Sequence, residues 1–250
     1  MCPPVVRVQN VSKHFRLPHE KHTTIVDHIS TFSALGGRHF EEFWALQDVS
    51  FELERGGSVA LVGPNGSGKS TLLKLLANIL RPDKGSITVR GSIAPILELG
   101  VGFHRDLTVK ENALIYGVIM GLRRSEMKKR IADILDFSGL AEFQDADLKK
   151  LSSGMQVRLA FSIAIESDAD VFLVDEALAV GDAGFQRKCL DRFQEFEEHG
   201  KTLIVVSHDM DLIKSLCEVG VYLHKGRTQF VGGSNEAARL YLEDVTARQQ

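Results

Sequence analysis

Apolar residues recur along this chain with two different periods, and the changes of period predict an alternation of strands and helices. Short runs rich in β-branched and apolar residues predict strands. The early runs lie near residues 5–9, 49–54, 58–62 and 86–97. Later, the run 171–174 is apolar throughout, which is typical of a parallel strand buried on both faces, and 202–206 is another β-branched strand. This pattern predicts an α/β fold.

Apolar spacing of three and four residues predicts helices between these strands. One helix begins near Lys69, and a mostly helical stretch covers about 103–165, with a capping box formed by Thr108 and Glu111. The last expected elements are a hairpin of 219–223 with 228–231 and a short helix over about 234–246.

Length and composition fit a globular protein of a reducing compartment. The 250 residues are 44% hydrophobic, which allows one large domain or two small ones. No apolar run approaches the roughly 20 residues that cross a bilayer. The amino terminus lacks a secretion-signal pattern, and the cysteines are scattered at 2, 189 and 217, so we expect a cytosolic protein. The net charge of −3 gives no basic footprint, which argues against a nucleic-acid partner.

The strongest chemical signal lies between the 58–62 strand and the helix that follows it. This stretch fits G-x-x-x-x-G-K-[ST], a loop that binds nucleoside triphosphates. Its glycines let N–H groups turn toward phosphate oxygens, Lys69 supplies a positive charge, and the Ser70 hydroxyl is suited to Mg²⁺. The predicted binding residues are Gly63, Pro64, Asn65, Gly66, Ser67, Gly68, Lys69, Ser70 and Thr71.

Two later strands end in groups that suit phosphoryl transfer. Asp175 and Glu176 follow the strand at 171–174; Asp175 is placed to hold Mg²⁺ and Glu176 to orient the attacking water. His208 follows the strand at 202–206, where its imidazole can reach the γ-phosphate or the water. Alone, each pattern is also typical of an acidic turn or a structural histidine. Because ligands bind at the carboxyl ends of parallel strands, we expect these residues to share a crevice with Lys69.

A second anion site is predicted at a helix start between these motifs. Ser152, Ser153 and Gly154 precede residues 157–164, which have helical apolar spacing. Hydroxyls and free N–H groups converge at such a helix start. An ordinary serine cap is the alternative interpretation.

Together the motifs resemble the ABC ATPase family. A phosphate loop (63–70), a signature loop (151–155), an acidic strand end (171–176), a D-loop (179–182) and a switch histidine (His208) follow in that family's order. The resemblance implies a single nucleotide-binding domain over 1–250, with a mixed sheet core, an antiparallel β subdomain and an inserted helical subdomain at about 103–165. It also implies ATP hydrolysis by a head-to-tail homodimer. Each ATP then lies between one subunit's phosphate loop and the other's signature loop.

Less universal segments narrow the resemblance to the branch that exports cell-surface polysaccharides. They are 42–46, 97–104, 151–155 and 175–189. That branch moves O-antigen, capsule or teichoic-acid polymers across the bacterial cytoplasmic membrane. The resemblance therefore implies integral membrane permease subunits as partners and a peripheral position on the cytoplasmic face of the inner membrane. The alternatives are an ABC ATPase of lipid export or cell-division signalling, and a soluble ABC ATPase acting on nucleic acid or ribosomes.

This sequence departs from the family pattern in two places. The family's metal-contacting glutamine is absent, since no glutamine lies between Gln47 and Gln144. Glu98 takes its place, with His104 as second choice, and a carboxylate keeps the metal contact but has no N–H to donate. The common D-loop serine is also absent, which leaves Asp182 as the residue carried over from that loop.

In this family the adenine base stacks on an aromatic side chain early in the chain. Phe15 matches that position, and Phe43 and Trp44 are alternatives.

Residues 16–44 resemble an insertion. Ile25, Ile29 and Phe32 have helical spacing there, and Gly36-Gly37 indicates a stop. The insertion is either a short helix packed on its own domain or a segment beside the nucleotide or the membrane subunit. Some relatives continue into a carbohydrate-binding domain, whereas this chain ends at Gln250, so we do not expect it to recognise the polymer directly.

Overall fold

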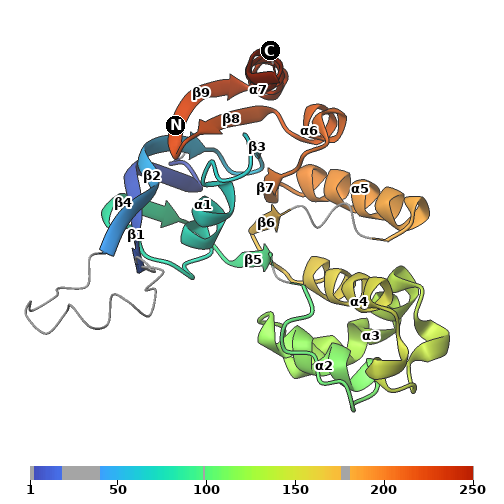
Figure 1. Cartoon of the computed structure of the whole chain (residues 1–250). Helices are drawn as coiled ribbons and strands as arrows, with labels where there is room; N and C mark the ends of the chain where they lie inside the picture. Colours follow the sequence, from blue (N-terminus) through green and yellow to red (C-terminus); the bar gives the residue numbers. More distant parts are fainter. Residues whose placement is uncertain (1–2, 19–39, 98, 176–180, 250) are drawn as a thin grey trace, which may run out of the picture.

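The structure, a computed structural model, describes residues 3–18, 40–97, 99–175 and 181–249. Glu98, Glu176 and most of the expected insertion lie outside these residues. The described residues form an α/β fold with a mixed sheet, an antiparallel sheet and helices, which confirms the predicted fold class (Figure 1).

Within the described residues, a six-stranded sheet forms the centre of the fold. Its order is β5-β6-β7-β3-β8-β9, in which β8 and β9 are antiparallel and the other neighbours are parallel. The strands are β3 (Ser58–Val62), β5 (Ile93–Ile96), β6 (Val171–Asp175), β7 (Thr202–Val206), β8 (Val219–His224) and β9 (Arg227–Gly233). The predicted hairpin is confirmed as β8 and β9.

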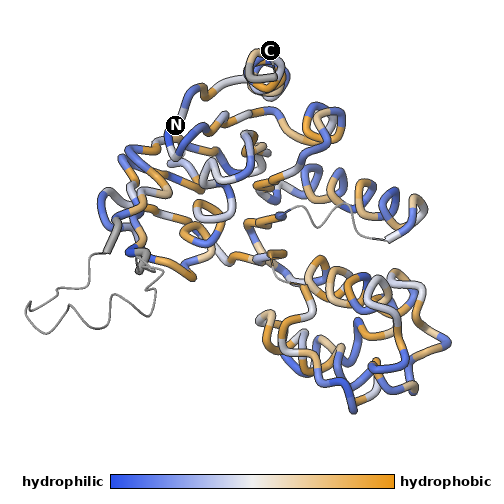
Figure 2. The backbone as a smooth tube through the Cα atoms, in the orientation of Figure 1, coloured by the Kyte–Doolittle hydropathy of each residue, from blue (hydrophilic) through white to orange (hydrophobic). Residues whose placement is uncertain are grey.

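The central strands are apolar because both faces of the sheet are covered. Phe172 and Val174 of β6 face one core, and Val171 and Leu173 face another, since side chains alternate along a strand. The first core is closed by the helices α4 (Ser153–Ile165), α5 (Ala183–Glu198), α6 (Met210–Leu216) and α7 (Ser234–Gln249). The second is closed by α1 (Lys69–Leu76) and the antiparallel sheet. In Figure 2 the central strands are accordingly mostly orange.

The antiparallel sheet has the order β2-β1-β4. Its strands are β1 (Val6–Pro18), β2 (Phe40–Leu53) and β4 (Lys84–Val89). β1 and β2 are much longer than predicted, because bulges hide their continuity: Asn10 and Asp48 have positive φ and are joined by a side-chain hydrogen bond of 2.7 Å. Pairing nevertheless continues to Pro18 with Phe40, so the ends of the expected insertion are strands. The predicted strand region 86–97 is divided between β4 and β5, which belong to different sheets.

The helices fall into a group on the sheets and a separate helical unit. The first group is α1 (Lys69–Leu76), α5 (Ala183–Glu198), α6 (Met210–Leu216) and α7 (Ser234–Gln249). The helical unit, below the sheets in Figure 1, is α2 (Val109–Ile119), α3 (Arg124–Ser138), the 3-10 turns Ala141–Phe143 and Leu148–Lys150, and α4 (Ser153–Ile165). It has an apolar core of its own.

The predicted capping box is confirmed, because Thr108 and Glu111 each accept the other's backbone N–H. In the part of the chain described, no helix combines the length and the apolar character needed to cross a membrane.

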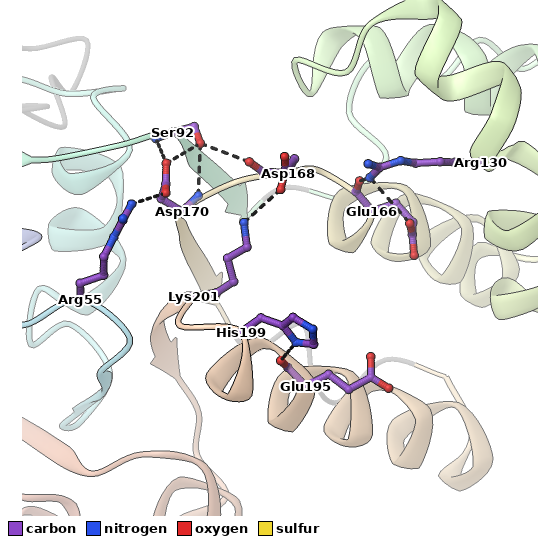
Figure 3. A network of polar contacts seen from close by, with 9 residues as sticks. All are labelled: Arg55, Ser92, Arg130, Glu166, Asp168, Asp170, Glu195, His199 and Lys201. Atoms are coloured by element: carbon purple, nitrogen blue, oxygen red, sulfur yellow. Dashed lines mark hydrogen bonds and ion pairs between the residues drawn. The ribbon is translucent and has the colours of Figure 1, made fainter.

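A polar network ties the amino-terminal ends of the parallel strands together (Figure 3). Asp170, just before β6, accepts hydrogen bonds from the Ser92 backbone N–H at 2.9 Å and from the Arg55 guanidinium. Lys201, just before β7, donates to Asp168 at 3.0 Å. Since Ser92 precedes β5 and Arg55 precedes β3, this edge is fixed by side chains. The opposite edge carries the candidate site.

Candidate functional site

The candidate site lies where β3 ends and α1 begins. Three glycines of the connecting loop have positive φ, with 149° at Gly63, 76° at Gly66 and 104° at Gly68. A Cβ at Gly63 would lie 2.1 Å from the Leu223 carbonyl oxygen, and one at Gly68 would lie 2.6 Å from the Ala45 carbonyl oxygen. Only glycine therefore lets the loop pack this closely against β8 and β2.

The loop combines buried polar groups with a glycine that no neighbour crowds. Apart from the residues adjacent to it in the chain, no atom of the described residues lies within 4 Å of the place that a Cβ at Gly66 would take. Lys69 is only 6% exposed, and its Nζ donates to the carbonyl oxygens of Gly63 and Pro64 at 2.7 and 3.0 Å. Within the described residues, the buried Ser67 hydroxyl has no hydrogen-bond partner. The buried Lys69 ammonium supplies positive charge for phosphate oxygens, and the Ser67 hydroxyl can donate a hydrogen bond to one of them.

A pocket of about 200 Å³ extends from the loop to β2. Residues 65–71 line one side, and Phe43 and Ala45 line the other. α1 begins at Lys69, so the positive end of its dipole is at this pocket. The arrangement suits an anion that carries an apolar or aromatic group.

Sheet register brings other predicted residues to the same edge. Leu61 of β3 is level with Val206 of β7, which is level with Asp175 of β6. The phosphate loop, Asp175 and His208 thus follow three neighbouring parallel strands at their carboxyl ends, where α/β sheets bind ligands. Asp175 is half-buried and His208 is exposed.

The edge offers oxygen ligands for a divalent cation. The Ser70 hydroxyl in the first turn of α1 and the Asp175 carboxylate are the hard donors that Mg²⁺ prefers, alongside phosphate oxygens. Among the described residues, no group of three or more His, Cys, Asp or Glu side chains could hold a metal ion by itself. The donor set fits an ion shared with a nucleotide.

His208 lies in a tight turn between β7 and α6. The Ser207 hydroxyl accepts a hydrogen bond from the Asp209 backbone N–H at 3.0 Å. Asp209 in turn caps α6 by accepting from the backbone N–H groups of Asp211 and Leu212 at 3.0 and 3.1 Å. These bonds fix the backbone on both sides of the histidine.

Two predicted residues, Glu98 and Glu176, lie outside the described part of the chain. The alternative to Glu98, His104, is tied to the helical unit. Its backbone N–H donates to Asn112 Oδ1 at 2.7 Å, and its carbonyl accepts from Asn112 Nδ2 at 2.9 Å. Asn112 is buried in α2, so the segment after β5 is anchored to that helix.

The predicted signature loop, residues 151–155, forms a turn at the start of α4, and it is called the signature turn from here on. Ser152 accepts a hydrogen bond from the Met155 backbone N–H at 3.2 Å, so it is a serine cap, while Ser153 and Gly154 are exposed. The carboxyl end of α4 leads to β6, and its amino end lies in the helical unit, away from α1 (Figure 1). A single chain therefore does not bring its signature turn to its own phosphate loop.

Asp182 caps α5. Its carboxylate accepts from the Phe185 backbone N–H at 2.9 Å and from the Arg158 guanidinium of α4 at 3.2 Å. These contacts join α4 to the start of α5. A contact between Asp182 and nucleotide stays a prediction.

The aromatic candidates occupy two faces of the β1–β2 ribbon. Phe15 pairs with Phe43, so both project from one face, and Phe43 is 49% exposed at the pocket. Trp44 projects from the other face, where its ring centroid lies 5.2 Å from that of His14. Phe43, one of the alternatives, thus lines the pocket, with Phe15 as its cross-strand neighbour.

Gly226, in the turn between β8 and β9, supports the phosphate loop, and no sequence pattern indicated this role. The Gly226 backbone N–H donates to the Ser67 carbonyl at 3.1 Å, and its carbonyl accepts from the Gln47 backbone N–H at 2.7 Å. A Cβ there would lie 2.7 Å from the Ala45 carbonyl oxygen. The turn signal at this glycine predicts a hairpin but not what the hairpin touches.

Comparison with known proteins agrees with this geometry. The ABC transporter family matches residues 46–179, more than half of the chain. The O-antigen export system ATP-binding protein RfbB of Klebsiella pneumoniae is 39% identical over 244 residues, which is 96% of this chain and 98% of that protein. The teichoic acids export ATP-binding protein TagH of Listeria monocytogenes serotype 4b is 35% identical over 96% of this chain and 70% of that protein.

Solved structures share the fold. The ATP binding subunit of an ABC transporter has a TM-score of 0.75 at 22% identity and covers 98% of both chains. A dimeric ATP-binding cassette in a post-hydrolysis state, bound to ADP and phosphate, has a TM-score of 0.73 at 22% identity over 92% of this chain and 98% of that one. The phosphate loop, the family match and the identity to RfbB lead to one conclusion: this chain belongs to the ABC transporter family.

Proposed function

We propose that this chain is the ATP-binding and ATP-hydrolysing subunit that energises export of a lipid-linked, O-antigen-like polysaccharide across the bacterial cytoplasmic membrane. The observation that carries the proposal is the 39% identity to the O-antigen export protein RfbB over nearly the full length of both chains. Buried Lys69 and the pocket that residues 65–71 line support the first half, because they suit a nucleoside triphosphate.

In this proposal ATP is enclosed between two copies of the chain that face in opposite directions. The separation of the start of α4 from α1 in one chain supports it, because a second chain can then supply the other half of the pocket (Figure 1). Each ATP contacts one subunit's loop and the exposed Ser153 and Gly154 of the other. ATP favours the closed pair because both halves bind it only there. Closure then moves the permease.

Hydrolysis uses groups at the carboxyl edge of the sheet. Lys69 offsets the charge of the phosphates, Glu176 orients the attacking water, and His208 holds a hydrogen bond to the γ-phosphate or the water. Ser70 and Asp175 would hold Mg²⁺, which supplies positive charge beside the phosphate oxygens. The Phe43 ring, which lines the pocket and has Phe15 as its cross-strand neighbour, stacks on adenine.

An exposed apolar face of α2 supports a permease partner. Ile115, Val118 and Ile119 are 45%, 48% and 61% exposed and have the spacing of one helix face. They line a groove of about 500 Å³ that also has Glu111 and Arg124 on its walls. An apolar groove with charged groups on its rim suits a short amphipathic helix of an integral membrane subunit. This contact holds the chain at the cytoplasmic face of the inner membrane as a peripheral subunit.

A deletion strain tests the proposal. Loss of the chain should remove polysaccharide from the cell surface and leave lipid-linked polymer inside the cell, measured by surface labelling and lipid extraction. The intact gene should restore export, and a Lys69→Ala variant produced at the same level should not. Normal surface polysaccharide in the deletion strain would contradict polysaccharide export and leave another membrane function of this family.

A further inference from the structure

We propose that Gln156 is a positioning residue for the signature turn and that it acts on ATP bound by the other subunit. The inference rests on the proposed function, because it needs the turn to complete the opposite site. The Gln156 side chain donates from Nε2 to the carbonyl oxygens of Leu151 and Leu148 at 3.1 and 3.3 Å. Its backbone N–H donates to the Ser152 carbonyl at 3.0 Å. One residue thus holds three carbonyls on the approach to the turn.

These contacts determine how the turn is presented. Leu148 and Leu151 are buried in the core of the helical unit, so their carbonyls are fixed points. With those carbonyls held by Gln156, and with the Ser152 hydroxyl accepting from the Met155 N–H, the exposed residues Ser153 and Gly154 have a defined place. Donors that stabilise a transferring phosphoryl group act through such preorganisation.

The Gln156 hydrogen bonds also connect the signature turn to the segment that follows β5. The Leu148 N–H donates to the Leu107 carbonyl at 2.9 Å, and buried Asn112 donates to that carbonyl at 3.1 Å. Asn112 also holds His104, as described above. Hydrogen bonds therefore run from the segment after β5, through Leu148 and Gln156, to the signature turn.

The contacts of Gln156 with Leu148 and Leu151 require a side-chain N–H donor, and this requirement decides which variants test the proposal. Gln156→Glu keeps the shape of the side chain but has no N–H to donate, whereas Gln156→Lys keeps donors. We expect Gln156→Glu to lower kcat for ATP hydrolysis by up to about 100-fold, the order of loss when a reacting group is misplaced by about 1 Å. ATP affinity of its own phosphate loop should not change. Gln156→Lys should retain most of the rate, and Gln194→Glu, at an exposed position of α5, is the matched control.

Mixed dimers separate positioning from a general loss of structure. One pair combines a Lys69→Ala chain with a Gln156→Glu chain, which leaves one intact composite site. The other pair combines an unaltered chain with a chain that carries both substitutions, which leaves none. Both pairs hold the same substitutions in total, so a merely structural effect is equal in the two.

Single-turnover hydrolysis by the two pairs decides the matter. The proposal predicts normal hydrolysis at about half of the sites in the first pair and slow or absent hydrolysis in the second. Equal rates would overturn it. A reference set with Ser153→Arg in place of Gln156→Glu separates the two levels of the argument. If that set shows the difference and the Gln156 set does not, only the role of Gln156 fails; equal rates in both sets overturn the shared site and the Gln156 proposal together.

Discussion

Single residues of the phosphate loop are selected by what the neighbouring backbone excludes. Gly63 and Gly68 face carbonyl oxygens at distances that no Cβ accepts, whereas the space beside Gly66 is open. All three have positive φ, so any side chain there carries conformational strain. Gly63 and Gly68 are required for the close packing of the loop, whereas Gly66, which lines the pocket, is required only for its backbone conformation.

This difference predicts unequal effects of alanine. Gly66→Ala should lower the free energy of unfolding by about 1–2 kcal/mol, the cost of a left-handed residue. Gly68→Ala should cost about 3 kcal/mol or more, because strain is added to overpacking against β2. Urea unfolding of both variants measures the difference. Equal losses would show that the loop does not press on Ala45 as described.

The sequence indicated where the motif residues lie better than it indicated which residues support them. Lys69, Asp175 and His208 follow strands that the hydrophobic pattern located, so their shared edge could be expected. Phe43 was only an alternative, because bulges in β1 and β2 conceal which side chains share a face. Gly226 was missed because its contact with Ser67 joins segments far apart in the chain.

At the scale of elements, the two edges of the central sheet do different work. The amino-terminal edge is closed by ion pairs and hydrogen bonds around Asp170 (Figure 3). The carboxyl edge is shaped by the loop and by short turns, and it carries the candidate site. Stability and chemistry are therefore separated along the strands.

The contribution of Asp170 to the free energy of unfolding should depend on pH. The Ser92 N–H, with further help from the Ser92 hydroxyl and Arg55, lowers the pKa of Asp170 against the opposing effect of burial. Because the folded-state pKa is below the unfolded one, the stabilisation is complete above the unfolded value of about 3.9 and is lost as pH falls through the folded value. Asp170→Asn should cost about 1–2 kcal/mol at pH 7, less what solvent screens. The difference from the unaltered protein should shrink below about pH 4 in denaturant titrations. A difference that stays constant from pH 7 to pH 3 would contradict the assignment.

The exposed face of α2 leads to a prediction about partner binding, with little effect on stability. Ile119→Glu places a charge in the apolar groove, where the residue is 61% exposed, so the fold should tolerate it within about 0.5 kcal/mol. Copurification of the membrane subunit should fall sharply, while ATP binding by the isolated chain is unchanged. Glu142→Gln in the 3-10 turn after α3 serves as a control that lies outside this groove. Unchanged copurification would move the permease contact elsewhere.

At the scale of the whole molecule, the architecture follows from where apolar surfaces can be covered. Runs such as 171–174 supply two cores, one on each side of the sheet, and this was readable in the sequence. The helical unit could be located as a range because its capping box and apolar spacing are local signals. Its orientation, with the start of α4 away from α1, depends on long-range packing that no local pattern encodes (Figure 1).

That orientation leads to the central claim, a site shared between two oppositely facing chains. Glu176→Gln most directly tests it, because the variant keeps an oxygen acceptor and loses the carboxylate proposed to orient the attacking water. It should bind ATP, hydrolyse it slowly and accumulate as the closed pair. Sedimentation velocity with ATP and Mg²⁺ is the decisive measurement. The account predicts a dimer that holds two ATP molecules and dissociates when ATP is removed; a monomer at saturating ATP would contradict it.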